Sequence, residues 1–273
     1  MNHPPLSADE FAAYRTRIGM NAPLRCDLAS LHALHHLHPL AIAFESLESF
    51  CGGIPSLEPA QVFAKLVKAG RGGYCFEQNQ LFWRVLRTLG FQVKPLAARV
   101  LLPDRQMPRT HMVLLVTLDG IEWLADVGFG GMTMTAPLRL DLATAQDTPH
   151  ERWQVQRSDD EYLVSAEVEG EFQPKFRVAL AQQIHEDYEM ANWVVASFPT
   201  SRFRNELIAA RPDANGRHAL GNKRLSYHRR GQASTHRELG SAAEAMEVLQ
   251  KIFGITTGNI SGLSQRLTEL FGS

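Results

Sequence analysis

The clearest candidate for chemistry is a cysteine at the start of a predicted helix. Cys75 follows two glycines, Gly72 and Gly73, and precedes apolar residues at helical spacing, Leu81, Phe82, Val85, Leu86 and Leu89. On the first turn of a helix, free backbone N–H groups and the helix dipole favour a thiolate, which is the nucleophilic form of cysteine. The position therefore predicts a nucleophile. The alternative is a small buried residue without chemistry, and a nearby base decides between the two.

A predicted β-hairpin supplies a base and an acid. Asp119 and Gly120 separate two apolar, β-branched runs, and Asp-Gly is a strong signal for a two-residue hairpin turn. In that register His111 faces Gly128, and Asp126 lies diagonally across on the same face, roughly 7 to 8 Å from His111 at Cα. A one-residue slip would separate the imidazole from the carboxylate. The alternative is a surface histidine and aspartate that only share a face.

Together these residues predict a catalytic triad. Cys75 would be the nucleophile, His111 the base, and Asp126 the group that orients the imidazole and stabilises the imidazolium. Such a set serves acyl transfer, but it serves thiol amidases, hydrolases and transglutaminase-like enzymes as well. A third alternative is a binding protein that keeps the fold without catalysis.

At these residues the chain resembles the arylamine N-acetyltransferases. The resemblance implies that Cys75 accepts an acetyl group from acetyl-coenzyme A, that His111 is the base and that Asp126 orients it. It also implies a small aromatic amine or hydrazine as acceptor and no metal. The motifs that carry the resemblance are Arg71-Gly72-Gly73-Tyr74-Cys75-Phe76-Glu77-Gln78-Asn79, Thr110-His111 and Asp126-Val127-Gly128-Phe129-Gly130-Gly131, with weaker matches at 17–19, 31–47 and 192–199.

The same resemblance implies further contacts. Gly128, Gly130 and Gly131 would lie near the pantetheine and phosphates of coenzyme A, where glycines allow backbone N–H groups to approach an anion. Phe44 and Phe129 would line the acceptor pocket; the alternative is that both are plain core aromatics. The chain departs from the family at Ser46, where an asparagine is usual, which affects the pocket rather than the triad. By charge alone, the candidates for binding the phosphates are Arg202, Arg204, Lys223, Arg224, Arg229 and Arg230.

Composition is that of a globular enzyme. The 273 residues are 44% hydrophobic and carry a net charge of −1, which argues against nucleic acid as a partner. No apolar run reaches the ~18 residues of a membrane span, and no signal-peptide pattern is present, so we expect a cytoplasmic protein without a membrane partner. Cys26, Cys51 and Cys75 form no Cys-x-x-Cys pair, which favours free thiols over disulfides or zinc.

A histidine cluster raises the question of a metal. His32, His35, His36 and His38 lie within seven residues, and His32 and His36 have the spacing of a helical metal pair. No cysteine or glutamate at helical spacing completes a ligand set. The apolar stripe Leu28, Leu31, Leu34 and Leu37 predicts that the histidines lie largely on the solvent side of the helix.

The chain divides into three predicted parts with an α+β fold. Residues 1–90 read as a helical bundle that carries Cys75, with helices expected after Ser7, between Asp27 and Pro39, over 59–70 and over 75–89. Residues 91–195 read as an antiparallel β-barrel followed by a connecting helix over 183–195, and 196–273 as an α/β lid with strands near Leu207 and Leu225. This arrangement of a helical bundle and a β-barrel resembles the core fold of cysteine proteases and transglutaminases.

Overall fold

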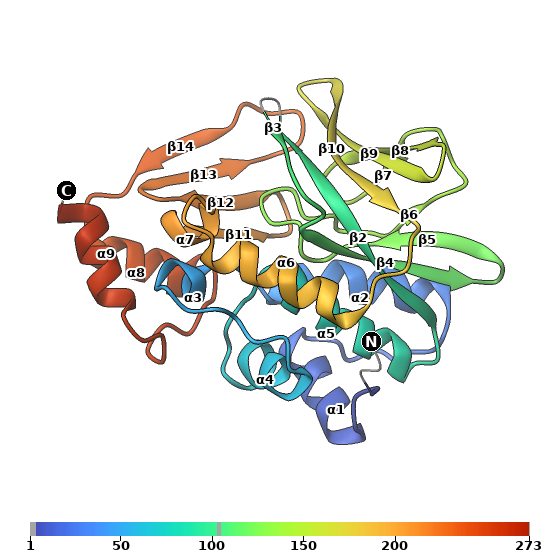
Figure 1. Cartoon of the computed structure of the whole chain (residues 1–273), viewed down its shortest axis with the longest axis horizontal. Coiled ribbons are helices and arrows are strands. Elements are labelled where there is room, and N and C mark those ends of the chain that lie inside the picture. Colours follow the sequence, from blue (N-terminus) through green and yellow to red (C-terminus); the bar gives the residue numbers. More distant parts are fainter. Residues whose placement is uncertain (1–3, 103–104, 273) are drawn as a thin grey trace.

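The protein has an α+β fold, as the sequence predicts. The computed structural model describes residues 4–102 and 105–272, with helices in the N-terminal third and two antiparallel sheets, which lie above α1, α4 and α5 in the view of Figure 1. Within the described residues, none of the helices is both long and apolar enough to cross a membrane. The N-terminal helices are α1 (Ala8–Arg17), α2 (Leu28–Ala41), α3 (Leu47–Phe50), α4 (Pro59–Phe63) with the π-helical turn η1 (Ala64–Lys68), and α5 (Cys75–Thr88).

Helix α5 lies at the centre of the molecule. All of its residues from Cys75 to Leu86 are buried, since one side packs on the N-terminal helices and the other on the barrel. Cys75 is the first residue of the helix, as predicted. The chain leaves the helix at Gly90, whose φ of 90° is the left-handed conformation that glycine adopts readily at helix ends.

The larger sheet is an antiparallel barrel of nine strands. Its order is β6-β5-β4-β2-β10-β9-β8-β7, with β3 paired to β2. The barrel closes where Arg139 of β6 and Gln146 of β7 exchange two hydrogen bonds of 2.8 and 2.9 Å. The strands are β2 (Gln92–Leu102), β3 (Arg105–Gln106), β4 (His111–Leu118), β5 (Ile121–Ala125), β6 (Leu138–Arg139), β7 (Gln146–Asp147), β8 (Arg152–Ser158), β9 (Glu161–Val168) and β10 (Glu171–Ala179).

Strands β4 and β5 form the predicted hairpin. Asp119 and Gly120 have positive φ values of 50° and 76°, as a two-residue turn requires, and Leu118 pairs with Ile121. The ladder ends where Leu114 pairs with Ala125, so the expectation that Gly128 faces His111 in the sheet is wrong. After β5 the backbone N–H groups have other partners than β4: Asp126 donates to His35 of α2, Val127 to Asn79 of α5, and Gly128 to the Asp126 carboxylate.

The C-terminal part forms a second sheet. Its order is β1-β11-β12-β13-β14, and the loop that contains Asn215 and Gly216 joins β11 to β12. The edge strand β1 comes from the N-terminal part: Phe44 pairs with Ala210 and Glu45 with Ala209. The remaining elements are β1 (Phe44–Glu45), α6 (His185–Ser197), α7 (Arg202–Asn205), β11 (Ile208–Pro212), β12 (Arg217–Gly221), β13 (Arg224–His228), β14 (Thr235–Glu238), α8 (Ala242–Lys251) and α9 (Leu263–Gly272).

A buried ionic cluster supports the N-terminus of α5. Lys65 Nζ lies 2.8 Å from Glu48 and 2.7 Å from Glu77, and Arg71 lies 2.6 Å from Glu45. Glu77 is on the first turn of α5, where its Oε2 accepts the Tyr74 N–H at 3.1 Å. Burial raises the pKa of Glu77 to about 7, although Lys65 acts in the opposite direction. Lys65 therefore compensates a buried carboxylate two residues from Cys75.

We expect Lys65→Met to lower the free energy of unfolding by about 3–5 kcal/mol at pH 8, because Glu77 would stay buried without its cation. The loss of unfolding free energy should be smaller at pH 5, because the raised pKa of Glu77 keeps its carboxyl group protonated in the folded protein. In the unfolded chain the same group loses its proton above ~4.5, so the destabilisation by Lys65→Met grows as the pH rises above that value. Urea denaturation at the two pH values measures both effects.

The exposed Lys68, on the same turn, is the control. Lys68→Met should change stability by less than about 0.5 kcal/mol. The double variant Lys65→Met/Glu77→Gln should regain much of the loss, since no unpaired charge then remains buried. A loss below about 1 kcal/mol for Lys65→Met at pH 8 would contradict this account of the cluster.

Candidate active site

The three residues of the predicted triad meet at the N-terminus of α5. His111 Nε2 lies 2.7 Å from Asp126 Oδ2, and both side chains are buried. The Cys75 thiol lies close enough to His111 to contribute to the raised pKa of its imidazole, and its sulfur donates to the Thr110 carbonyl oxygen at 3.8 Å. Because Nε2 faces Asp126, the other ring nitrogen, Nδ1, is left for the thiol. The order of contacts is therefore cysteine, histidine, aspartate, as a nucleophile, its base and an orienting acid require.

The electrostatics of the pair favour a charged imidazole. Burial alone would lower the pKa of His111, but the Asp126 carboxylate and its hydrogen bond outweigh burial and raise that pKa to about 10. Burial likewise acts to raise the pKa of Asp126, and here His111, Asn79 and the Gly128 N–H outweigh it and hold the pKa below its ordinary value. The pair thus consists of an imidazolium and a carboxylate near neutral pH.

Asp126 is held by groups that sequence reasoning did not single out. Its Oδ1 accepts hydrogen bonds from Asn79 Nδ2 and the Gly128 N–H, both at 2.9 Å. Asn79 also donates to the Met112 carbonyl oxygen at 2.7 Å and accepts the Val127 N–H at 3.0 Å. Asn79 lies one helical turn after Cys75, so the helix that carries the nucleophile also fixes the acid. The spacing of four residues between Cys75 and Asn79 in the motif could have indicated that both side chains lie on the same face of the helix.

Gly128 is required by close packing against α5. A Cβ atom at this position would lie 2.8 Å from the Cys75 Cα, closer than real Cβ atoms approach, and 3.1 Å from the Gln78 Cβ, which is a tight contact. The glycine therefore lets the loop after β5 approach the nucleophile helix. This packing explains Gly128 without reference to a cofactor.

Two members of the histidine cluster are buried beneath the triad, so the expectation that they face solvent is wrong. His35 Nε2 accepts the Asp126 N–H at 3.0 Å, and His38 bonds to Tyr14 at 2.9 Å and to Gln78 at 2.8 Å. Burial lowers the pKa of His35 to about 3 and that of His38 to about 4, which keeps both rings neutral. The buried face of α2 is Leu31, Leu34, His35 and His38, whereas Leu28 is 40% exposed.

His35 and His38 therefore have structural hydrogen-bond partners in the core. Within the described residues, no group of three or more histidine, cysteine, aspartate or glutamate side chains is placed to hold a metal ion. The helical spacing of these residues could have revealed the buried stripe, because Leu31, Leu34, His35 and His38 recur at three and four residues.

Aromatic rings surround the triad. The Phe129 ring lies 5.2 Å from the His111 ring and 5.1 Å from Phe176, between centroids. Phe44 forms an isolated bridge with Gly73 and packs 5.9 Å from Phe203, so it borders the turn before Cys75. The two predicted pocket aromatics thus approach the triad from different elements. Sequence reasoning did not identify Phe176 and Phe203.

The other residues expected to contact the cofactor or the acceptor lie in different environments. Gly130 packs against the Phe44 ring, and a Cβ at Gly131 would meet nothing within 4 Å among the described residues. Ser46 is buried, and its hydroxyl has no hydrogen-bond partner there. Most of the six basic residues proposed from charge already have partners: Arg202 with Glu206, Arg204 with the Ser197 carbonyl, Arg230 with Asp147, Lys223 over Phe271, and Arg229 over Tyr227.

Known proteins are similar to this chain in both sequence and fold. A family model described as N-acetyltransferase matches residues 27–260. The arylamine N-acetyltransferase of Mycolicibacterium smegmatis is 37% identical over 262 residues, 93% of this chain and 95% of the relative. That of Escherichia coli (strain K12) is 39% identical over 246 residues, 89% of this chain and 87% of the relative.

Solved structures agree. The M. smegmatis arylamine N-acetyl transferase superimposes with a TM-score of 0.91 at 36% identity, covering 96% of this chain and 99% of that chain. The Mycobacterium marinum arylamine N-acetyltransferase in complex with CoA gives a TM-score of 0.91 at 34% identity, covering 96% and 98%. On this match of sequence and fold, the chain belongs to the arylamine N-acetyltransferase family.

Proposed function

We propose that this acyltransferase carries the acetyl group of acetyl-CoA to arylamines through a thioester on Cys75. The observation that carries the proposal is the buried His111–Asp126 pair, 2.7 Å apart, with the Cys75 thiol beside it on the first turn of a helix. A buried imidazolium and the N-terminal end of α5 both favour negative charge at the position of the Cys75 sulfur.

The proposed reaction has two steps. In the first, the Cys75 thiolate attacks the acetyl carbonyl, the bond to the coenzyme A sulfur breaks, and that sulfur takes the proton of the His111 imidazolium. In the second, an amine attacks the Cys75 thioester, neutral His111 accepts the proton that the amine loses, and the Cys75 thiolate leaves. The imidazolium–thiolate pair is thereby restored, and Asp126 stabilises the imidazolium in both steps.

The acceptor follows from protonation. Alkyl amines have a pKa near ~10 and are almost wholly protonated at neutral pH, so their lone pair is occupied. An aromatic amine or a hydrazine is much less basic and arrives as the free nucleophile. Phe44 and Phe129 would provide faces for a flat ring beside His111. The cytoplasmic location and the absence of a nucleic-acid or membrane partner remain predictions from the sequence.

We expect Cys75→Ser to abolish formation of the acetyl-enzyme, because a hydroxyl is far less acidic than a thiol and forms no ready ion pair with His111. Intact-protein mass spectrometry after mixing with acetyl-CoA should show one added acetyl group in the parent and none in the variant. Cys26→Ser and Cys51→Ser are the controls and should keep the acetyl group on Cys75. An acetyl group mapped to Cys26 or Cys51 would overturn the assignment.

Asp126→Asn should make His111 neutral at pH 7, because burial then lowers its pKa without an opposing carboxylate. Alkylation of Cys75 by iodoacetamide at pH 7 should become much slower, and NMR of the His111 ring should show no imidazolium. Alkylation as fast as in the parent would show that Asp126 has only a structural role.

The same shift has a stability consequence with a defined sign. Because the pKa of His111 is raised on folding, its contribution is complete below the unfolded value of ~6.5 and is lost as pH rises through about 10. The parent should therefore lose stability relative to Asp126→Asn between pH 7 and pH 10. Parallel urea titrations of the two proteins measure this difference, and a constant difference over that range would contradict the raised pKa.

Anilines and aryl hydrazides should be acetylated at neutral pH much faster than alkyl amines of similar size. Phe129→Ala should slow the use of ring-bearing acceptors more than it slows acetylation of Cys75, since a ring contact contributes on the order of 1 kcal/mol beyond burial. Coenzyme A release measures the rates. Release without any amine that matches either rate would favour a thiol hydrolase instead.

A further inference from the structure

Two arginines lie directly opposite each other in the barrel wall. Arg99 of β2 and Arg177 of β10 are Cα partners in the antiparallel ladder. Their neighbours Ala98, Phe176 and Val178 point into the barrel core, so the alternation of side chains places both arginines on the outer face. Like charges directly opposite in a sheet are destabilising. In residues 4–102 and 105–272 neither guanidinium forms an ion pair with a carboxylate.

The pair lies beside the nucleophile. On the same face of β2 as Arg99, Ala97 pairs with Met112, which packs with Cys75 in one apolar cluster. Since Ala98 pairs with His111, the position opposite Arg99 in this register is Thr110, whose carbonyl oxygen lies 3.8 Å from the Cys75 sulfur. Arg99 therefore extends the face that carries α5, just beyond the N-terminus of that helix.

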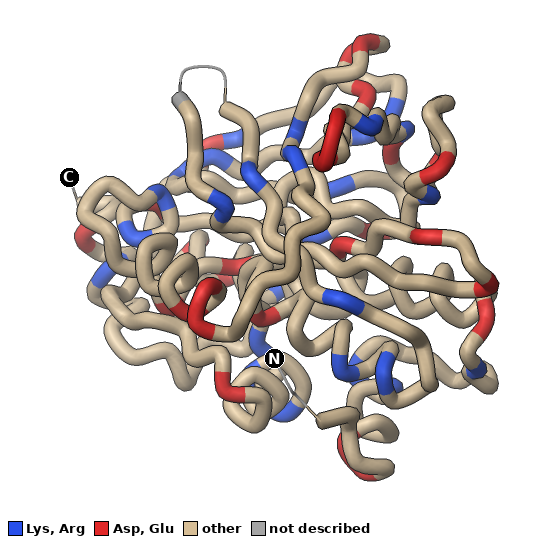
Figure 2. The backbone as a smooth tube through the Cα atoms, turned by 45° about the vertical axis from the view of Figure 1, so that its right-hand side comes forward, with Lys and Arg blue, Asp and Glu red and all other residues tan. Residues whose placement is uncertain are grey.

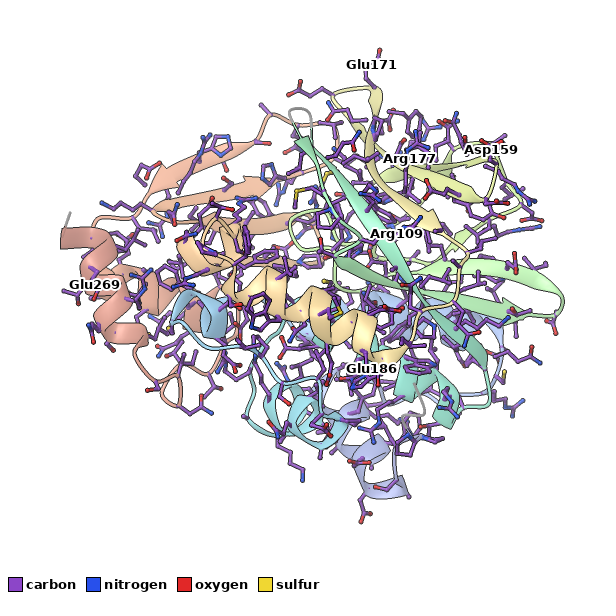
Figure 3. All side chains as sticks on the ribbon, viewed as in Figure 1. Arg109, Asp159, Glu171, Arg177, Glu186 and Glu269 are labelled. Carbon is purple, nitrogen blue, oxygen red and sulfur yellow. The ribbon has the colours of Figure 1, made fainter. Side chains whose placement is uncertain are left out.

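A third arginine adds to the charge. Arg109, next to Thr110, pairs with Glu161 at 3.0 Å, and Glu161 is the diagonal neighbour of Arg177 across β9 and β10. Figure 3 shows Arg109 and Arg177 beside β10. Elsewhere basic and acidic positions are distributed over the whole chain (Figure 2). The three arginines and one glutamate leave two positive charges at this point, and the Met107 carbonyl, the neutral partner of Arg99, offsets neither.

We infer that Arg99 and Arg177, with Arg109 beside them, bind phosphate groups of the acetyl-CoA donor. This rests on the proposed function, since the donor is what brings phosphates to Cys75. Guanidinium groups bind phosphate oxygens with paired, charge-assisted hydrogen bonds. A bound phosphate relieves the repulsion between two arginines that have no carboxylate partner among the described residues. It also fixes the donor on the side of the barrel where its thioester can reach the thiol.

The test compares two donors with the same reacting group. Acetyl-CoA carries phosphates, whereas S-acetyl-N-acetylcysteamine is an acetyl thioester without any. Arg99→Gln and Arg177→Gln should each raise the KM for acetyl-CoA about tenfold, and the double variant more, with kcat nearly unchanged. Acetylation of Cys75 by the phosphate-free donor should stay at the parent rate. Added salt should raise the KM for acetyl-CoA less in the double variant than in the parent.

Arg157→Gln is the matched control, because Arg157 is an exposed arginine of the same sheet that pairs with Tyr162 on β9. Arg157→Gln should leave the KM for acetyl-CoA and the rate of acetylation by the phosphate-free donor unchanged. The double variant should melt no lower than the parent, since its substitutions remove a like-charge contact. An unchanged KM for acetyl-CoA, or an equal loss with both donors, would overturn the inference. Failure of the parent to form acetyl-Cys75 from either donor would instead contradict the proposed function.

Discussion

The buried Asp126 carboxylate is the constraint on which the site depends. A carboxylate with no solvent exposure is costly unless charge and hydrogen bonds replace water. Here the partners come from separate elements: His111 from β4, Asn79 from α5, and the Gly128 N–H from the loop itself. These groups satisfy the carboxylate together only when the barrel, the helix and the loop are in one arrangement. The charge thus couples catalysis to the packing of the whole N-terminal half.

Residues at the start of α5 connect the helix to several other elements. Tyr74, just before the helix, donates its hydroxyl to Asn192 of α6, and Glu77 bonds to Lys65 of η1. Gln78 bonds to His38 of α2 and to three backbone carbonyls around it. Successive residues around Cys75 are therefore each tied to a different element. A thiol that must approach a fixed imidazole within hydrogen-bond reach needs a helix held in this way.

The features predictable from sequence were those set by short-range chemistry. The Asp119-Gly120 turn determined the register of β4 and β5, because turn type determines register, and that register indicated the proximity of His111 and Asp126 although the ladder itself ends at Leu114 and Ala125. Asn79 and His35 were not identified, since their role exists only once helices far apart in sequence pack on the loop after β5. The same holds for β1: two residues form a strand there only because β11, more than 160 residues later, offers an edge.

In the proposed site, the placement of charge separates the triad from the arginines inferred to bind the donor. His111 faces the barrel core, while Arg99 and Arg177 lie on the outer face of the same wall. A guanidinium beside His111 would disfavour the imidazolium that the thiolate requires. On the outer, half-exposed face solvent screens the arginines, whereas the buried contact of 2.7 Å between His111 and Asp126 is screened little. In the proposed arrangement, an anionic donor can therefore bind to the arginines without changing the protonation of the His111–Asp126 pair.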